Sequence, residues 1–276
     1  MLERTFDVGL QLAGLGWNVG ASQRPLVVLH GYLEQALAWE RVVQELDREV
    51  WAYDHRGHGH SEHIGPASHS AFWDYVYDLD ALLDLLHPDG PVDLLGHSMG
   101  GTVASLYAGS RPERVHRLIL VEGLGPPDDS QRLVHRSEMA LRHKRKGRDH
   151  GAPMADLEGA VKRMLRFNSS LDPTFALRLA QRQTESVPGG IQWRWDAALR
   201  HRSPRAFIAD HFSAWLQAIR APTLLVDGSE STYNHPERRR HIRDHRHVVL
   251  RGCGHLVHHD DPLGLATEIT DFLSAP

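Results

Sequence analysis

The sequence predicts an α/β protein with a mostly parallel central sheet flanked by helices. A helical cap is inserted in the chain between two parts of this core. Short apolar runs rich in β-branched residues alternate with segments of helical periodicity, a pattern typical of parallel strands joined by helices. The strand pattern disappears between Pro126 and about Trp215 and then resumes. We therefore expect residues 1–126 and 216–276 to form the core, and residues 127–215 to form a cap over the ends of the strands.

The expected core elements follow one another in the order that such a sheet requires. Residues 6–19 have the pattern of an initial hairpin, and residues 25–30 are a β-rich run that Gly31 closes. Residues 36–46 and 70–87 repeat apolar side chains at helical intervals. Further strands are expected at 49–54, 92–95, 115–123, 222–228 and 247–252, and a final helix at 262–273.

The composition is that of an ordinary globular chain, and we expect its partner to be a small molecule. Its 276 residues are 41% hydrophobic, enough for a large core, and 31 Lys and Arg against 35 Asp and Glu give a net charge of −4. We therefore expect no nucleic-acid and no membrane partner. A single cysteine, Cys253, fits a reducing compartment, and no targeting segment or membrane span is evident. The expectation is a cytoplasmic monomer or homodimer.

A glycine-flanked serine is the first sign of chemistry. Residues 92–101, VDLLGHSMGG, run from a buried strand into Gly96, Ser98 and Gly100 and then into a helix. A Gly-x-Ser-x-Gly sequence in that position supports a sharp turn that lifts the serine out of the sheet. The backbone N–H of Met99 would then face the group that Ser98 attacks, as one donor of an oxyanion hole.

Two further segments supply what a serine nucleophile needs. His30-Gly31-Tyr32 ends an early strand, where the backbone N–H of Tyr32 is the expected second oxyanion donor. His255 follows the last expected strand, where a neutral imidazole would accept the Ser98 proton and later return it to a leaving group.

The 21 histidines suggest a metal site, which we do not expect. His55, His58, His60 and His63 lie in one glycine-punctuated loop, and His255, His258 and His259 lie in another. No glutamate accompanies a histidine pair at the helical spacing of zinc peptidases. Cys253 has no turn of its own to expose it, so we expect a packed, inert thiol. The basic stretch 141–150 is expected to be the solvated face of a cap helix.

These motifs together resemble the α/β-hydrolase superfamily. The landmarks are HGYLEQALAWERV, YDHRGHGHSE, GHSMGGTVASLYAGSRPERVHRLILVEGLGPP and GCGHLVHHDDP, and the resemblance extends over nearly the whole chain outside the cap. HGYLEQALAWE and LVEGLGPP are most similar to the serine hydrolase-like branch, which is related to meta-cleavage hydrolases and haloalkane dehalogenases. Because Ser98 replaces the aspartate that dehalogenases and epoxide hydrolases need, the resemblance implies acyl transfer to water without a cofactor.

The acid of the triad is where this sequence departs from the common family pattern. Most relatives place an aspartate three residues after the glycine that closes the strand at 222–228, and Ser231 stands there in this chain. Glu230 is one residue away. Some dehalogenases carry the acid at the end of the preceding core strand, where this chain has Glu122. We favour Glu122 as the residue that orients His255, with Glu230 and then Asp227 as alternatives.

The expected function is hydrolysis of a small carboxylic ester or lactone through an acyl-enzyme on Ser98. The cap should determine which substrate enters, because it closes over the serine. Its candidate pocket residues are aromatic: Trp193, Trp195, Phe207, Phe212 and Trp215. Two alternatives stay open, namely cleavage of a carbon–carbon bond as in meta-cleavage hydrolases, and a non-catalytic ligand-binding member of the same fold.

Overall fold

The computed structural model describes residues 1–21, 24–64, 71–146, 150–201 and 203–275. Within these ranges, no helix combines the length and the apolar character that crossing a membrane requires. The expected helix at 70–87 corresponds to α2 (Phe72–Leu86), and Ser70 lies outside the described residues.

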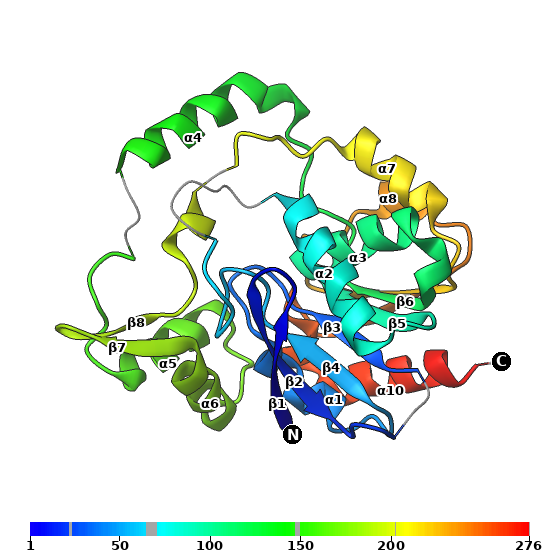
Figure 1. Ribbon diagram of the computed structural model, residues 1–276, viewed down its shortest axis with the longest axis horizontal. Helices are drawn as coiled ribbons and strands as arrows, with labels where there is room; N and C mark the ends of the chain where they lie inside the picture. Colours follow the sequence, from blue (N-terminus) through cyan, green and yellow to red (C-terminus); the bar gives the residue numbers. More distant parts are fainter. Residues whose placement is uncertain (22–23, 65–70, 147–149, 202, 276) are drawn as a thin grey trace.

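An eight-stranded sheet forms the centre of the molecule, with the order β1-β2-β4-β3-β5-β6-β9-β10 (Figure 1). β1 pairs with β2 and β2 with β4 in antiparallel fashion, and every other pair is parallel. The parallel strands therefore all end at one edge of the sheet. The strands are β1 (Leu2–Asp7), β2 (Gln11–Trp17), β3 (Leu26–Leu29), β4 (Val50–Tyr53), β5 (Val92–His97), β6 (Val115–Val121), β9 (Thr223–Gly228) and β10 (His245–Leu250).

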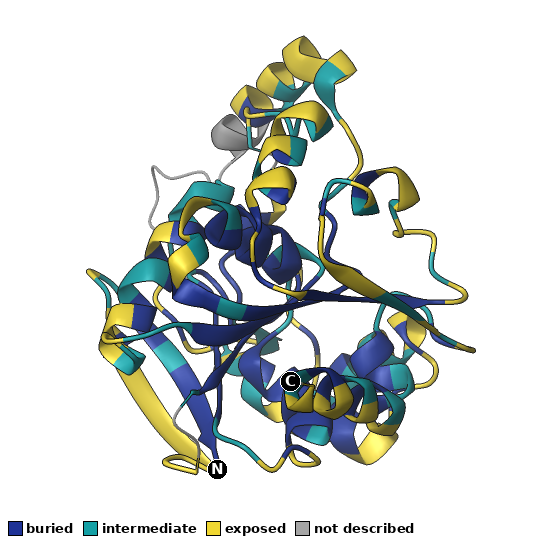
Figure 2. Cartoon of the chain, turned by 90° about the vertical axis from the view of Figure 1, so that its right-hand side faces the viewer, coloured by how far each residue is buried: buried dark blue, intermediate teal, exposed yellow. Residues whose placement is uncertain are grey.

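Helices cover both faces of this sheet because successive strand residues point to opposite sides. Val27 and Leu29 belong to the core beneath α2, α3 and α7, whereas Leu26 and Val28 belong to the core beneath α1 and α10. Figure 2 shows the buried strands between helices whose outer surfaces are exposed. These helices are α1 (Glu40–Val43), α3 (Met99–Ser110), α7 (Ala209–Ala218) and α10 (Pro262–Ser274). The short helices η1 (Ala36–Trp39), η2 (Pro112–Arg114), α8 (Pro236–Arg239) and α9 (Val257–Asp260) lie in the connections.

The segment between β6 and β9 contains helices and one hairpin. Its elements are η3 (Ser130–Arg132), α4 (Leu133–Lys146), α5 (Leu157–Phe167), α6 (Pro173–Gln183), β7 (Thr184–Val187), β8 (Gly190–Trp193) and η4 (Ala197–Arg200). The sequence does not predict the antiparallel β7–β8 pair, whose turn uses two glycines, with Gly189 at φ 88° and Gly190 at φ 145°. Figure 1 shows α4 above the sheet, and α5, α6 and the hairpin to one side.

The predicted end of the cap, at position 215, falls inside α7. This helix lies against α3 so closely that a side chain at Gly109 would meet the backbone of Trp215. Asp172 caps the N-terminus of α6 by accepting the N–H of Phe175. The basic stretch 141–150 begins in α4, but residues 147–149 lie outside the described residues. The predicted α/β fold with a mostly parallel sheet is confirmed.

Candidate active site

The predicted site residues all follow strands that end at the same edge of the sheet. Ser98 comes directly after β5, Glu122 directly after β6, and His255 five residues after β10. β5 and β6 are neighbours, with His97 opposite Val121, so the residues that follow them begin side by side. The pairing of β5 with β6 thus places Ser98 and Glu122 close together, although they are far apart in the sequence.

The turn at Ser98 has the backbone geometry that its glycines predict. Ser98 has φ 51° and ψ −112°, a conformation that costs free energy in a residue with a side chain and is found at functional turns. A Cβ at Gly96 would collide with the backbone of Gly100 and Gly101, so the strand could not approach the helix as closely with any other residue. Ser98 is held in place because α3 begins at Met99, immediately after it.

Three side chains make a hydrogen-bonded chain at this edge. His255 Nε2 lies 2.9 Å from Ser98 Oγ, and His255 Nδ1 lies 3.2 Å from Glu122 Oε2. A buried carboxylate accepts the Nδ1 proton, which leaves the Nε2 lone pair free to accept the serine proton. Chemically, this arrangement can supply a nucleophile, a general base and an orienting acid.

Glu122 is fixed by two donors besides His255. Its Oε1 accepts the N–H of Gly228 at 2.7 Å, and its Oε2 accepts the hydroxyl of Ser231 at 2.6 Å. The side chain is fully buried, and its φ of 52° turns the chain out of the strand at this point. Ser231 thus occupies the usual acid position and donates a hydrogen bond to Glu122, a role that sequence reasoning missed.

The alternative acids are placed elsewhere. Among the described residues, no hydrogen bond or ion pair joins Glu230 to His255, and Glu230 is exposed. Asp227 is buried and pairs with His247 at 2.9 Å and with Arg239 at 3.2 Å. Neither side chain takes the place that Glu122 occupies beside His255.

The two predicted oxyanion donors, Tyr32 and Met99, line the same cavity as Ser98. Met99 is the first residue of α3, where backbone N–H groups have no acceptor within the helix. Tyr32 lies in the turn after β3, and its phenol donates to the carbonyl of Leu199 at 3.0 Å, which connects this turn to η4 of the cap. Tyr233, a residue that the sequence did not indicate, packs its ring on His255 at a centroid distance of 4.3 Å.

The predicted histidine loop is a packed structural unit. His55 and His58 are buried beside His30, and burial lowers the pKa of His58 to about 3, so this ring is neutral. His60 and His63 bind the carbonyls of Arg182 and Arg194, at 3.0 and 2.8 Å. These contacts hold the loop against the cap.

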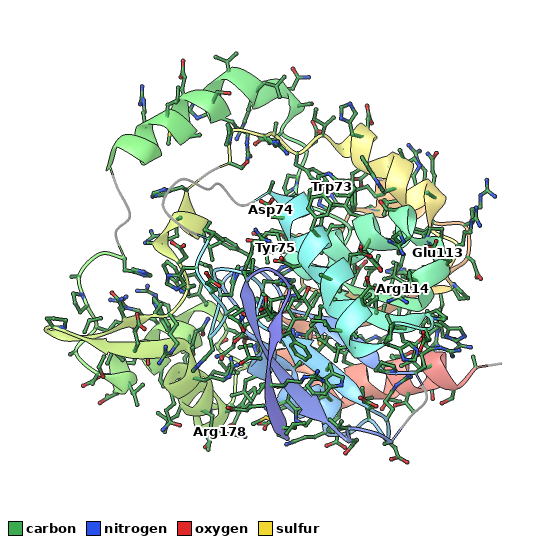
Figure 3. All side chains as sticks on the ribbon, in the orientation of Figure 1. Trp73, Asp74, Tyr75, Glu113, Arg114 and Arg178 are labelled. Atoms are coloured by element: carbon green, nitrogen blue, oxygen red, sulfur yellow. The ribbon has the colours of Figure 1, made fainter. Side chains whose placement is uncertain are left out.

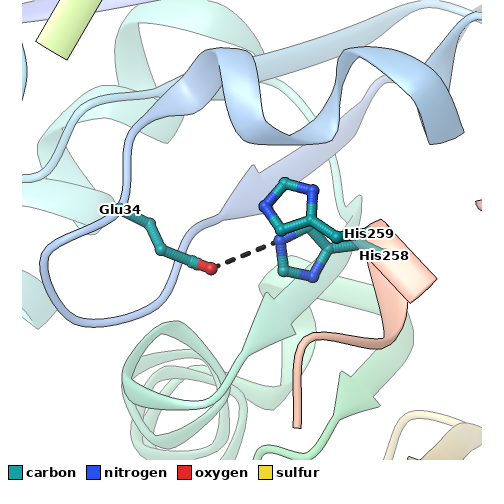
Figure 4. A group of neighbouring side chains, drawn as sticks. All are labelled: Glu34, His258 and His259. Atoms are coloured by element: carbon teal, nitrogen blue, oxygen red, sulfur yellow. Dashed lines mark ion pairs between the residues drawn. The ribbon is translucent and has the colours of Figure 1, made fainter. Parts of the chain in front are cut away.

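One group of side chains in the described part of the chain has ligand atoms close enough to share a metal ion. Glu34, His258 and His259 each place one such atom within 4.8 Å of the others, and Figure 4 shows the two histidines facing the carboxylate. Glu34 is already engaged, because its Oε2 accepts the N–H of Gly31 at 2.6 Å and lies 3.0 Å from His97 Nδ1. A divalent ion would have to share the carboxylate with these partners, so we assign no metal to the group.

Cys253 is buried in the loop that carries His255, two residues before it. Burial, together with the nearby carboxylates of Asp261 and Asp260, raises the pKa of its thiol to about 11. The thiol is therefore protonated at neutral pH and is a poor nucleophile.

A cavity of about 1420 Å³ opens above Ser98 and His255. Its core wall includes Trp73 and Tyr75 of α2, which Figure 3 labels, and Trp73 packs edge-on against Trp215 at a centroid distance of 5.6 Å. All the aromatic residues predicted for the pocket line it: Trp193, Trp195, Phe207, Phe212 and Trp215. Cap and core together therefore enclose the space in front of the serine.

Comparison with known proteins identifies the family. Residues 24–262 match the family described as alpha/beta hydrolase fold. The chain belongs to this family. It is 26% identical over 272 residues to "Serine hydrolase-like protein 2" of Homo sapiens. The match covers 90% of this chain and 86% of the relative. The predicted resemblance to this branch is confirmed.

Two further matches carry more specific names. The hydrolase-fold chain is 28% identical over 265 residues to the "sn-1-specific diacylglycerol lipase ABHD11" of Mus musculus, covering 90% of this chain and 80% of the lipase. A solved "Thioesterase Domain From Curacin Biosynthetic Pathway" superposes with a TM-score of 0.88 at 31% identity, covering 98% of this chain and 99% of that domain. The names of these relatives support the conclusion that this chain is a hydrolase.

Proposed function

We propose that this protein hydrolyses carboxylic esters or thioesters through an acyl-enzyme on Ser98. Ser98 Oγ attacks the acyl carbon while its proton passes to His255 Nε2, and the backbone N–H groups of Tyr32 and Met99 bind the oxyanion. The protonated His255 then gives its proton to the leaving group. A water molecule, deprotonated by the same imidazole, then attacks the acyl-enzyme. The bond from the acyl carbon to Ser98 Oγ breaks, the imidazolium returns its proton to Oγ, and the carboxylic acid is released.

One observation carries this proposal, namely the continuous hydrogen-bonded chain from Ser98 through His255 to Glu122. The nucleophile and base are 2.9 Å apart, inside the range that proton transfer needs, and the acid lies 3.2 Å from the other ring nitrogen. The relatives named as serine hydrolase-like protein, lipase and thioesterase are consistent with acyl transfer. A chain that only bound ligands would not need this arrangement.

Labelling with a fluorophosphonate tests the proposed nucleophile. We expect stoichiometric modification of Ser98, found by mass spectrometry of the peptide, together with loss of p-nitrophenyl butyrate hydrolysis. An unmodified Ser98 at probe concentrations that saturate a known serine hydrolase would identify a ligand-binding protein instead. Turnover of a ring-fission dienoate without turnover of esters or thioesters would assign carbon–carbon bond cleavage.

The cavity suggests a substrate larger than a small ester. At about 1420 Å³ it exceeds the roughly 300–1,000 Å³ that is usual for small-molecule sites. Aromatic side chains on α2 and α7 line one part, which suits an apolar acyl group. We therefore extend the expected substrate from a small ester to an acyl group on a sizeable carrier.

The cap adds positive charge to the same cavity. Residues 127–215 contain 16 Lys and Arg against 10 Asp and Glu, while the rest of the chain contains 15 against 25. Four exposed arginines line the cavity without an ion-pair partner among the described residues: Arg163, Arg166, Arg200 and Arg205. Unpaired cations in a cleft attract anions, so we propose that the substrate carries an anionic group away from its acyl carbon.

Matched thioesters test this charge preference. We expect kcat/KM for butyryl-coenzyme A to exceed that for butyryl-N-acetylcysteamine, and to fall as salt screens the arginines. R163Q/R166Q should lower kcat/KM for the coenzyme A thioester by about threefold to tenfold and leave the neutral thioester unchanged.

R132Q/R142Q is the control, because it removes the same charge from exposed cap positions outside the cavity lining. Equal losses in the two double variants would mean that the net charge of the cap acts, and not the arginines of the cavity. No difference between the two thioesters would contradict the anionic preference.

A further inference from the structure

A largely buried carboxylate, Glu34, and a fully buried imidazole, His97, contact each other beside Ser98 and His255. Glu34 is in the turn after β3, and His97 is the last residue of β5, immediately before Ser98. Glu34 Oε2 lies 3.0 Å from His97 Nδ1, and the side chain of His97 is 1% exposed. The proposed mechanism does not use either side chain.

The acceptors around His97 determine how many protons its ring carries. On the other side of the ring, Nε2 lies 2.9 Å from the backbone carbonyl of His255, and a carbonyl can only accept. Nε2 therefore carries a proton. Nδ1 faces Glu34, whose same oxygen accepts the N–H of Gly31 at 2.6 Å, as an ionised carboxylate does. With an acceptor at each nitrogen, the ring is doubly protonated.

We propose that His97 is a positioning residue, held as an imidazolium by Glu34, that fixes the His255 loop and the Tyr32 turn relative to Ser98. The inference rests on the proposed function, because it assigns these contacts to the same catalytic site.

The pair connects three segments that the reaction requires. Glu34 accepts a hydrogen bond from the N–H of Gly31, the residue before the proposed oxyanion donor Tyr32. His97 holds the carbonyl of His255, and its own backbone leads into Ser98. Each contact is a hydrogen bond to an ionised group, which is stronger and shorter than one between neutral groups. Displacement of reacting groups by about 1 Å can lower the rate about a hundredfold. The contacts of the Glu34–His97 pair therefore affect catalysis.

The pKa of His97 is shifted in the opposite direction from the pKa values of His258 and His259. Burial alone would lower the pKa of His97, but Glu34, the hydrogen bonds and the more distant Glu122 raise it above its ordinary value. Burial lowers the pKa of His258, whose Nε2 is 3.3 Å from the other oxygen of Glu34 and whose ring stacks on Trp39. Burial also holds the pKa of the adjacent His259 well below its usual range.

These pKa directions define the pH range in which the pair is intact. Burial alone would raise the pKa of Glu34, but His97 and His258 hold it well below its ordinary value, so its contribution to stability is lost only as pH falls through that lowered pKa. The raised pKa of His97 makes stability depend on pH in the opposite direction. Its contribution is complete below pH 6.5 and is lost as pH rises through the raised pKa.

Nitrogen-15 NMR of histidine-labelled protein tests the charge state without measuring activity. We expect the His97 ring, assigned through its contact with His258, to carry protons on both nitrogens at pH 7.5. The His258 ring should carry one proton at the same pH. A singly protonated His97 at pH 7.5 would overturn the proposal.

Kinetics of E34Q tests the positioning role, because glutamine keeps the shape and the acceptor for Gly31 while removing the charge. We expect kcat for an ester to fall about tenfold with KM nearly unchanged, since the displacement of reacting groups is small. The alkaline decline of kcat should move to lower pH, because His97 loses its proton earlier. E40Q is the control: Glu40 is buried and pairs with Arg178 on α6 (Figure 3), and it does not contact the triad.

The possible outcomes distinguish a failure of the positioning role of Glu34 and His97 from a failure of the proposed function. If the wild type is not labelled at Ser98 and hydrolyses nothing, the function fails while the NMR result still reports on the pair. If the wild type is active and E34Q matches E40Q in rate and pH profile, the positioning role is wrong. If E34Q does not fold, the wild-type alkaline limb must coincide with the His97 titration seen by NMR, and a mismatch contradicts the proposal.

Discussion

Replacing Ser98 by alanine is expected to lower kcat/KM for a p-nitrophenyl ester by about 10⁴-fold or more, because the variant retains the oxyanion hole but lacks the nucleophile. The fold should remain intact. Ser98 is partly exposed, and its hydroxyl hydrogen-bonds to His255 rather than to the core. Initial rates and thermal melting curves of the same preparations measure both effects.

A second serine provides the control for this experiment. Ser137 lies exposed on α4, where its hydroxyl bonds the carbonyl of Leu133 within the helix. S137A should therefore keep the wild-type rate. A purified S98A protein that retained a tenth of wild-type activity, with an unchanged melting curve, would show that the nucleophile is another residue.

The sequence was sufficient for the sheet because strand and helix periodicities differ and the core strands are buried on both faces. Neighbouring residues such as Leu26 and Val27 are both apolar and face different helix layers, which gives these strands the continuous apolar run of a parallel sheet. The β7–β8 hairpin was missed for a physical reason. Its residues are mostly half-buried or exposed and include Glu185 and Gln192, so they lack the apolar pattern that marks a core strand.

The turn at Ser98 could be predicted because its requirements lie in consecutive residues, whereas the contacts behind it could not. Ser98 and its glycines form one local turn. The Glu34–His97 pair joins residues 63 positions apart and depends on how β3 and β5 pair in the sheet. Ser231 was noticed only as a missing aspartate. A polar side chain at that position is a signal that the acid lies elsewhere and still needs a donor.

The charge of the cap shows how an average over the chain conceals a local property. The net charge of −4 argued against any basic surface, but it is the sum of an acidic core and a cap with an excess of six positive charges, 16 against 10. Counting charges by predicted segment would have revealed this asymmetry. Which arginines line the cavity still depends on the tertiary structure.

Replacing Glu122 by glutamine is expected to lower kcat at least a hundredfold with KM nearly unchanged, because loss of the His255 tautomer typically costs around 10⁴ in turnover. The hydrogen-bond donors around the carboxylate explain why the amide cannot substitute for it. The fixed N–H of Gly228 faces Oε1 and requires an oxygen there. The amide NH₂ would then face His255 Nδ1, so the ring would carry its proton on Nε2 and could not accept that of Ser98.

Two companion variants distinguish this explanation from the alternatives. E230Q changes an exposed carboxylate that does not contact His255 and should stay within about tenfold of wild type. S231A removes one donor from Glu122 but leaves the charge in place, so its loss should lie between those of E230Q and E122Q. A large loss in E230Q with a mild one in E122Q would move the acid to the loop after β9. Mild losses in both would mean that the backbone carbonyls and water around His255 suffice to orient it, since no other carboxylate of the described chain contacts this ring.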